Sequence, residues 1–238
     1  RHAALLKEIE RSCQALGQGD IHSNVIDVCH QSEMNGWIDH CDKQHSLDMV
    51  VANAGISSGT GGHRNGENPG AVRQVFDINL TGVLNTIDPA VSNMLDRGHG
   101  QIAIMSSLAA FSGWPGAPSY SASKAAVRIY GEALRGTLKK NGIKVNVICP
   151  GFIKTPMTAV NGYKMPFMIS ADRAAQIIDR ALQKNRGRIA FPWPTYLMAG
   201  VIGMLPYGIT SRILQNAPEK PDTQSGHTDQ DFCKNRLP

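Results

Sequence analysis

The 238-residue chain lacks a disulfide framework, a block of like charge and an uninterrupted apolar run long enough to cross a membrane. Its five cysteines are an odd number without framework spacing, so we expect free thiols in a reducing compartment, here the cytoplasm. Basic residues exceed acidic ones by 24 to 19, but they are scattered and not interleaved with aromatic residues. This distribution argues against a nucleic-acid partner.

Two stretches resemble a metal site and a membrane-spanning helix, but the spacing of their residues fits neither. The cysteines and histidines at Cys29, His30, His40, Cys41 and His45 do not have the ligand spacing of a tetrahedral zinc site, so we predict no metal. Residues 189–205 are apolar, but two prolines interrupt them and a membrane-spanning helix needs about 20 residues. We expect a strand and a helix covering a substrate pocket there, with contact at a membrane surface as an open alternative.

Hydrophobic periodicity predicts alternating helices and strands. Helical spacing of apolar residues covers residues 5–16, 32–45, 71–95, 120–139 and 171–183, with a kink expected at Pro89. Apolar runs typical of strands cover residues 21–28, 47–54, 101–105, 143–149 and 188–191. This order predicts one α/β domain with a parallel sheet over residues 1–217. Residues 218–238 are polar and poor in apolar side chains, and we expect a disordered tail there.

A tyrosine and a lysine four residues apart carry the first chemical signal. Tyr120 and Lys124 share one face of a predicted helix. An ammonium group near a phenol favours the phenolate and lowers the phenol's pKa, which makes Tyr120 a candidate general acid/base. Ser107 ends a predicted strand, where it could hydrogen-bond a carbonyl oxygen beside the phenol. Taken alone, this spacing is more often an ordinary exposed pair.

Other polar or small residues follow the predicted strands. They are Asp27 after the first strand, Asn53, Ala54 and Gly55 after the second, and Pro150 and Gly151 after the fourth. Because ligands bind beyond the carboxyl ends of parallel strands, these residues should line one edge of the sheet. Asn79 stands inside a predicted helix, where asparagine is unfavourable. Each residue alone could be a helix cap, a packed amide or a turn, but their joint order favours a ligand site.

In this order and spacing, the residues resemble the short-chain dehydrogenase/reductase family, up to about residue 190. The resemblance implies a Rossmann-like doubly wound parallel sheet and an NAD(P)-dependent oxidoreductase that interconverts an alcohol and a carbonyl by hydride transfer. It implies that Tyr120 is the proton donor, that Ser107 orients the carbonyl, and that Lys124 holds the nicotinamide ribose and lowers the tyrosine pKa. Asn79 is similar to an asparagine that anchors a water in a proton relay from Lys124 to solvent.

The resemblance also implies a set of cofactor-binding residues. The residues after the first strand would lie at the adenine, those after the second at the adenosine ribose, and those after the fourth at the nicotinamide. The set is Arg1, Asp27, Val28, Asn53, Ala54, Gly55, Tyr120, Lys124, Pro150, Gly151, Ile153 and Thr155. Arg1 would stand where a basic residue of the family reads the 2′-phosphate, so the resemblance favours NADP(H) over NAD(H).

The sequence departs from the family pattern at its beginning. The family opens with a strand, a glycine-rich turn for the cofactor diphosphate, a helix and a second strand, and this sequence contains none of them. The glycine-rich residues 59–62 are a poor substitute because no helix pattern follows. With no initiator methionine, we expect an N-terminal truncation that leaves residues 21–28 without a neighbour and residues 47–54 as an exposed edge. A catalytically inactive fragment or a non-catalytic scaffold is the alternative function.

The expected partners are a substrate and further copies of the chain. Residues 157–168 and Trp114 are rich in apolar side chains, and methionine adapts to irregular ligands, so we expect a small hydrophobic carbonyl or alcohol substrate. Family members pair through the helices that carry Asn79 and Tyr120. The resemblance therefore implies a homodimer or homotetramer for the intact protein.

Overall fold

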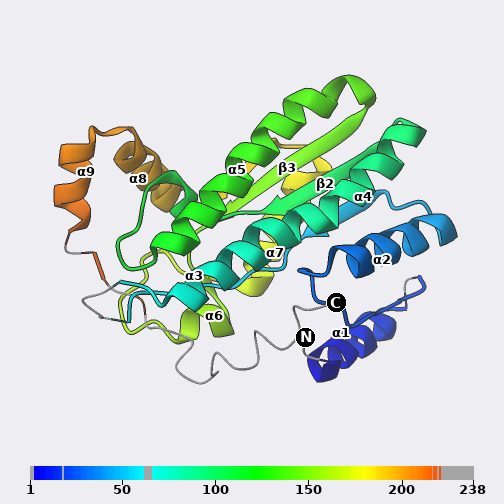
Figure 1. Cartoon of the computed structure of the whole chain (residues 1–238), viewed down its shortest axis with the longest axis horizontal. Coiled ribbons are helices and arrows are strands. Elements are labelled where there is room, and N and C mark those ends of the chain that lie inside the picture. The colour runs from blue at the N-terminus through cyan, green and yellow to red at the C-terminus, as the bar shows by residue number, and fades with distance from the viewer. Residues whose placement is uncertain (1–2, 18, 62–65, 216, 219, 221–238) are drawn as a thin grey trace.

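The computed structural model describes residues 3–17, 19–61, 66–215, 217, 218 and 220 (Figure 1). Its helices are α1 (Ala3–Ala15), α2 (Gln31–Gln44), α3 (Pro69–Phe76), α4 (Gly82–Arg97), α5 (Pro118–Leu138), α6 (Pro156–Ala159), α7 (Ala171–Gln183), α8 (Trp193–Met204) and α9 (Tyr207–Leu214). Its strands are β1 (Met49–Ala52), β2 (Gly100–Met105), β3 (Ile143–Pro150), β4 (Ile153–Lys154), β5 (Ile169–Ser170) and β6 (Arg188–Phe191). Three short turns are helical: η1 (Asp77–Thr81), η2 (Leu108–Phe111) and η3 (Lys139–Asn141).

The central sheet has the order β1-β2-β3-β6, and every pairing in it is parallel. Parallel neighbours need a crossover, and the chain provides helices between successive strands. The predicted α/β fold with a Rossmann-like parallel sheet is therefore confirmed. Because all four strands run the same way, their carboxyl ends lie at one edge of the sheet, where Ala52, Met105, Pro150 and Phe191 end β1, β2, β3 and β6.

Alternate side chains of the strands build a core on each face of the sheet. On one face, Ile102, Ile104 and Val145 are fully buried in a cluster with residues of α2, α4 and α5. On the other face, Ala103 and Ile148 pack against α7 and β6. Figure 1 shows α4 and α5 running side by side across the front of the sheet, with α7 behind it. Helices on both faces explain why the strands read as continuous apolar runs.

The N-terminal region differs from the prediction, because residues 21–28 do not form a strand. They run without regular structure into a turn, in which an oxygen of Asp27 accepts a hydrogen bond from the backbone N–H of Cys29 at 3.1 Å. The predicted helix is present as α1, but none of its described side chains is buried. A strand needs a partner to satisfy its backbone groups, and an apolar run by itself does not provide one.

The long helix predicted over residues 71–95 is interrupted, but not at Pro89. Pro89 lies inside α4, whereas the regular α-helix is broken by the π-turn η1. Inside η1, the side-chain amide of Asn79 pairs with both backbone groups of Ile56. A π-turn inserts an extra residue into a helix, so the side chains around it leave their regular helical positions. Such turns are frequent at functional sites.

Strand β1 is an edge of the central sheet in the part of the chain that the structure describes, as predicted. Its Val50 and Ala52 are buried, but Val51 on the opposite face is 45% exposed. An apolar edge strand pairs readily with other chains.

We expect the substitution Val51→Lys to slow aggregation several-fold in light-scattering measurements and to leave the midpoint of unfolding unchanged. Val50→Lys, which places the charge at a site 6% exposed, should unfold the protein. If wild type and Val51→Lys aggregate at the same rate, β1 is not the edge through which the chains pair.

Candidate active site

The site begins with two hydroxyl groups at the carboxyl edge of the sheet. Ser107 follows β2 and caps η2, where its side chain accepts a hydrogen bond from the N–H of Ala109 at 3.1 Å. Tyr120 stands in the first turn of α5, which starts with Pro118 because proline needs no N–H partner there. The Ser107 hydroxyl lies close enough to the Tyr120 phenol to lower its pKa. The sequence placed both residues in the candidate site, and the fold brings them together.

The first turn of α5 is held by a residue that the sequence did not single out. The Glu67 carboxylate accepts hydrogen bonds from the backbone N–H and the hydroxyl of Ser119, both at 2.8 Å. A carboxylate at a helix N-terminus is stabilised by the unpaired N–H groups and the helix dipole. Glu67 thus fixes the residue that precedes Tyr120.

Lys124 lies one helical turn beyond Tyr120 and is almost fully buried. Its Nζ is 5.9 Å from the centre of the Tyr120 ring and donates a hydrogen bond to the carbonyl of Met105 at 2.9 Å. Burial disfavours an ammonium and lowers the pKa of Lys124 to about 8, while the neighbouring Cys149 opposes part of that shift. The predicted approach of Lys124 to Tyr120 is therefore present.

The pKa of Tyr120 differs in direction from the expectation. Burial raises the pKa of this phenol, the hydrogen bond from Ser107 lowers it in part, and the nearby Tyr163 raises it further. The Lys124 ammonium does not reverse this, because it lies beside the ring and donates to the Met105 carbonyl. Tyr120 is thus held as a neutral phenol, the form that can donate a proton.

Asn79 and Gly55 join the loop after β1 to the same cluster. The Asn79 Oδ1 accepts from the N–H of Ile56 at 2.8 Å, and its Nδ2 donates to the Ile56 carbonyl at 2.9 Å and to the Ser123 hydroxyl at 3.0 Å. A methyl group on Gly55 would lie 3.1 Å from the Lys124 Nζ and 3.3 Å from the Asn79 Oδ1. Glycine is therefore needed for this approach of three elements.

The other predicted cofactor residues lie around this cluster at different distances. The Ser107 hydroxyl is 3.5 Å from the Pro150 carbonyl, and the Gly151 N–H donates to the carbonyl of Phe191 at 2.7 Å. Asn53 and Ala54 are exposed directly after β1. Four more belong to other elements: Asp27 and Val28 to the turn before α2, Ile153 to β4, and Thr155 to the N-terminus of α6. Arg1 lies outside the described residues.

Lys220 is a site residue that the sequence did not predict. Only 7% of it is exposed, its Nζ donates to the Ser57 hydroxyl at 2.6 Å, and the same nitrogen is 5.6 Å from the centre of the Tyr120 ring. Pro218 and Lys220 therefore pack against the domain, although the sequence assigned them to a disordered tail; residues 221–238 lie outside the described residues. No apolar period marks this segment, so no local pattern could reveal it.

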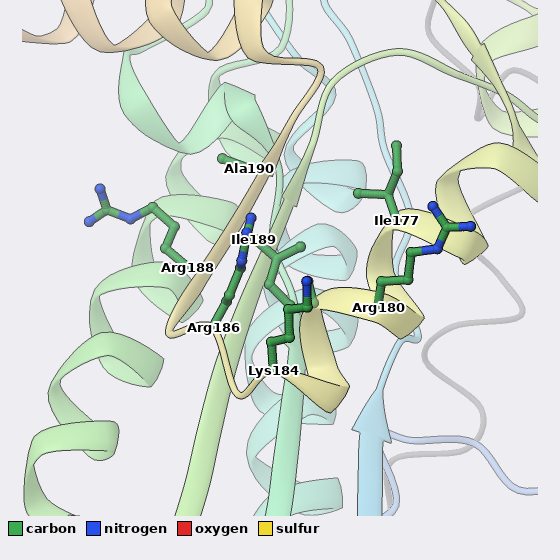
Figure 2. Close-up of a pocket in the computed structure, with 8 residues that line it drawn as sticks. Ile177, Arg180, Lys184, Arg186, Arg188, Ile189 and Ala190 are labelled. Atoms are coloured by element: carbon green, nitrogen blue, oxygen red, sulfur yellow. The ribbon is translucent and has the colours of Figure 1, made fainter.

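A cavity elsewhere in the molecule is separate from this cluster of site residues. A cavity of about 270 Å³ lies between α7 and β6, and none of the predicted site residues lines it. Figure 2 shows that its basic side chains diverge, with Arg188 pointing away from α7 and Arg180 pointing to the opposite side. Arg188 is also paired with Glu132 at 2.7 Å. In the described part of the chain, no group of three or more histidine, cysteine or acidic side chains could hold a metal ion.

Comparison with known proteins decides the family. The sequence profile described as short chain dehydrogenase matches residues 1–165, most of the chain. The chain belongs to the short-chain dehydrogenase family. The family match includes Asn79, Ser107, Tyr120 and Lys124 and ends before α7. In this short-chain dehydrogenase, none of the helices in the described residues is long and apolar enough to span a membrane.

Relatives of this short-chain dehydrogenase carry oxidoreductase names. An uncharacterized oxidoreductase of Myxococcus xanthus is 35% identical over 160 residues, which are 67% of this chain and 62% of that protein. A 3-oxoacyl-(acyl-carrier-protein) reductase of Rickettsia conorii is 32% identical over 157 residues, 66% of this chain and 64% of the relative. The chain thus spans somewhat less than two thirds of the length of these relatives.

Solved structures share the fold of this short-chain dehydrogenase. A 3-oxoacyl-(acyl-carrier-protein) reductase of Brucella melitensis with bound NAD is 27% identical, with a TM-score of 0.63 over 79% of this chain and 77% of that one. A gluconate 5-dehydrogenase of Burkholderia cenocepacia in complex with NADP and tartrate is 26% identical, with a TM-score of 0.59 over 64% of this chain and 60% of that one.

Proposed function

We propose that this short-chain dehydrogenase interconverts an alcohol and a carbonyl by hydride transfer with a nicotinamide cofactor. The observation that carries the proposal is the grouping of the Ser107 hydroxyl, the Tyr120 phenol and the Lys124 ammonium, the last 5.9 Å from the centre of the phenol ring. A neutral phenol, an orienting hydroxyl and a buried cation are the groups that a carbonyl reduction needs beside the reacting oxygen. Relatives named as oxidoreductases support the same reaction class.

The residues present fit one end of the cofactor. Gly55 leaves Lys124 and Asn79 in close approach, and the Lys124 ammonium has N–H donors beyond the one bonded to the Met105 carbonyl that could bind a ribose hydroxyl. Structures similar to this one contain NADP or NAD. For the diphosphate end, the sequence offers no glycine-rich turn before a helix: Gly59 and Gly61 lie in a loop, and Gly62 lies outside the described residues.

The chain's own groups handle the substrate oxygen and its proton. The nicotinamide, when bound, supplies the hydride in reduction and accepts it in oxidation. In reduction, Ser107 orients the carbonyl, and the electron pair released from the C=O bond takes the proton of Tyr120, which leaves an alcohol and a phenolate. The Lys124 ammonium one turn away stabilises that phenolate until a proton returns from solvent. Oxidation follows the same steps in reverse.

Substrate size, assembly and location complete the proposal. Apolar side chains at Met157, Val160, Phe167 and Met168 are each more than a third exposed, which supports a substrate with a small hydrophobic body.

The exposed apolar side chains of Ile129 and Tyr130 on α5 support pairing into a homodimer or homotetramer through α4 and α5. A cytoplasmic location remains our prediction from the free cysteines.

The cofactor provides the test of the proposed function. We expect the protein to oxidise NADPH, followed by loss of the nicotinamide absorbance, when small ketones are supplied, and to bind NADPH more tightly than NADH. Arg1→Ala should narrow that difference by about tenfold, because it removes a charge-assisted contact to the 2′-phosphate. Arg11→Ala, in α1, is a matched control that should leave the preference unchanged. Tighter binding of NADH would overturn the NADP(H) assignment, and absence of turnover with either cofactor would overturn the proposed reaction.

A second candidate is a catalytically inactive or non-catalytic scaffold, because the residues that the structure describes offer no glycine-rich turn for the cofactor diphosphate. The two candidates differ in what the folded protein does with cofactor. A scaffold would unfold cooperatively but show no shift of its unfolding midpoint with NADPH, whereas binding raises the midpoint of an enzyme by mass action.

A further inference from the structure

The segment around Lys220 is anchored over the active site by its backbone. The indole N–H of Trp114 donates to the carbonyl of Pro218 at 3.2 Å, and the N–H of Gly61 donates to the carbonyl of Lys220 at 2.9 Å. Lys220 also packs so closely on Gly59 that a methyl group there would lie 2.4 Å from the Lys220 carbonyl oxygen. These contacts place Lys220 between the loop after β1 and the loop before α5.

The Lys220 ammonium is buried without an opposite charge. Among the described residues it forms no ion pair, and its contacts are the Ser57 hydroxyl and the Tyr120 ring. An ammonium has three N–H donors, and one hydroxyl acceptor leaves two of them for another group. A buried cation with no counter-charge is costly, which is why such groups are normally paired. The arrangement is therefore suited to an incoming anion.

Two further polar groups belong to the same loop. The hydroxyls of Ser58 and Thr60 are buried and have no hydrogen-bond partner among the described residues, and Ser58 is only 2% exposed. Buried hydroxyls are nearly always hydrogen-bonded, so unpaired ones in the loop that packs on Lys220 are open to a ligand.

We propose that Lys220 is a specificity residue that binds a carboxylate on the substrate while Ser107 and Tyr120 bind its carbonyl. The substrate class is then an oxo acid, or the matching hydroxy acid, with a small apolar body. The proposal rests on the proposed function. A single ammonium with hydroxyl neighbours suits a singly charged carboxylate, whereas a phosphate usually meets arginine or several N–H groups. Lys220 lies beyond residues 1–165, so the family match does not account for it.

Binding of small oxo acids tests the proposal without any need for turnover. The probes are 2-oxo-, 4-oxo- and 5-oxohexanoate and their methyl esters, which differ from the acids in charge, and binding is measured by calorimetry on the whole chain. We expect at least one acid to bind about tenfold or more tightly than its ester, as a charged hydrogen bond in a buried site would give. Lys220→Gln should remove that preference, and Lys220→Arg should retain most of it. Lys140→Gln, at an exposed lysine in η3, should leave it unchanged.

A second variant tests the position of the charge. Gly59→Ala leaves the lysine in place but pushes its backbone away, so it should also weaken acid binding while ester binding stays the same. The proposal is overturned if no acid is preferred over its ester, or if Lys220→Gln keeps the preference. It is equally overturned if Lys220→Gln tightens acid and ester alike, because Lys220 would then be blocking the site. Absence of NADPH turnover in every variant would instead overturn the proposed function and leave this result standing.

Discussion

Replacing Tyr120 with phenylalanine is expected to lower kcat for NADPH-dependent ketone reduction by about 100-fold or more, the usual contribution of general acid–base catalysis. The substitution removes the phenol proton that we propose is given to the carbonyl oxygen, and it takes away the hydroxyl beside Ser107. The ring itself stays, so its contacts with Lys124 and Lys220 are kept. Steady-state rates should be measured in the longest protein that the gene encodes.

The control for this experiment is on the same helix. Tyr130→Phe removes a hydroxyl from an α5 tyrosine that is 38% exposed, and its rate should equal that of wild type. NADPH affinity should change little in Tyr120→Phe, because a loss confined to kcat identifies an interaction made in the transition state. Ketone reduction at a near-normal rate in Tyr120→Phe would remove Tyr120 from the mechanism.

Lys124→Met should have opposite effects on activity and stability. Turnover should fall by about 100-fold or more, because no cation remains to stabilise the phenolate. Stability at pH 7 should rise. Burial lowers the pKa of Lys124 from 10.5 to about 8, and each pKa unit corresponds to about 1.4 kcal/mol, so the folded charge costs about 3 kcal/mol. Loss of the hydrogen bond to Met105 offsets about 1 kcal/mol, which leaves a gain of about 2 kcal/mol in urea unfolding.

The stability difference between Lys124→Met and wild type should depend on pH, which a difference in packing alone would not produce. Between pH 8 and 10.5 the unfolded wild-type lysine binds a proton that the folded one has lost, so wild-type stability rises with pH in this window. The advantage of Lys124→Met should be complete below pH 8 and should turn into a disadvantage of about 1 kcal/mol above pH 10.5, where only the lost Met105 hydrogen bond remains. Lys140→Met, at an exposed position, is the matched control and should leave the stability at pH 7 unchanged. A destabilised Lys124→Met at pH 7 would mean that the ammonium stabilises the fold.

The parts of the site that the sequence predicted are those that depend on local spacing. Tyr120 and Lys124 are one turn apart on any helix, and Ser107 and Pro150 end apolar runs that any parallel sheet brings to one edge. The strand expected at residues 21–28 failed because a strand depends on a partner elsewhere in the chain. The pKa direction of Tyr120 failed because burial, which spacing does not reveal, outweighs the nearby lysine.

The position of Lys220 could not be predicted for a different reason, the distance in sequence between Lys220 and its partners. Its partners, Ser57 and Tyr120, precede it by at least a hundred residues, and its own neighbourhood is rich in proline and charge. Such composition is typical of a solvated tail. Only the assembled surface reveals that Lys220 is a buried cation, which local patterns do not predict.

The pairing of Asn79 with Ile56 makes the backbone N–H of Ile56 a natural reporter of an assembled site. That N–H is protected by a side chain from another element, η1, and the same side chain also bonds Ser123 on α5. Its exchange with solvent therefore requires the Asn79 side chain to leave Ile56, which would release the link between the loop after β1, η1 and α5. One amide signal, followed by hydrogen exchange, would count the fraction of molecules in which the catalytic groups are in place.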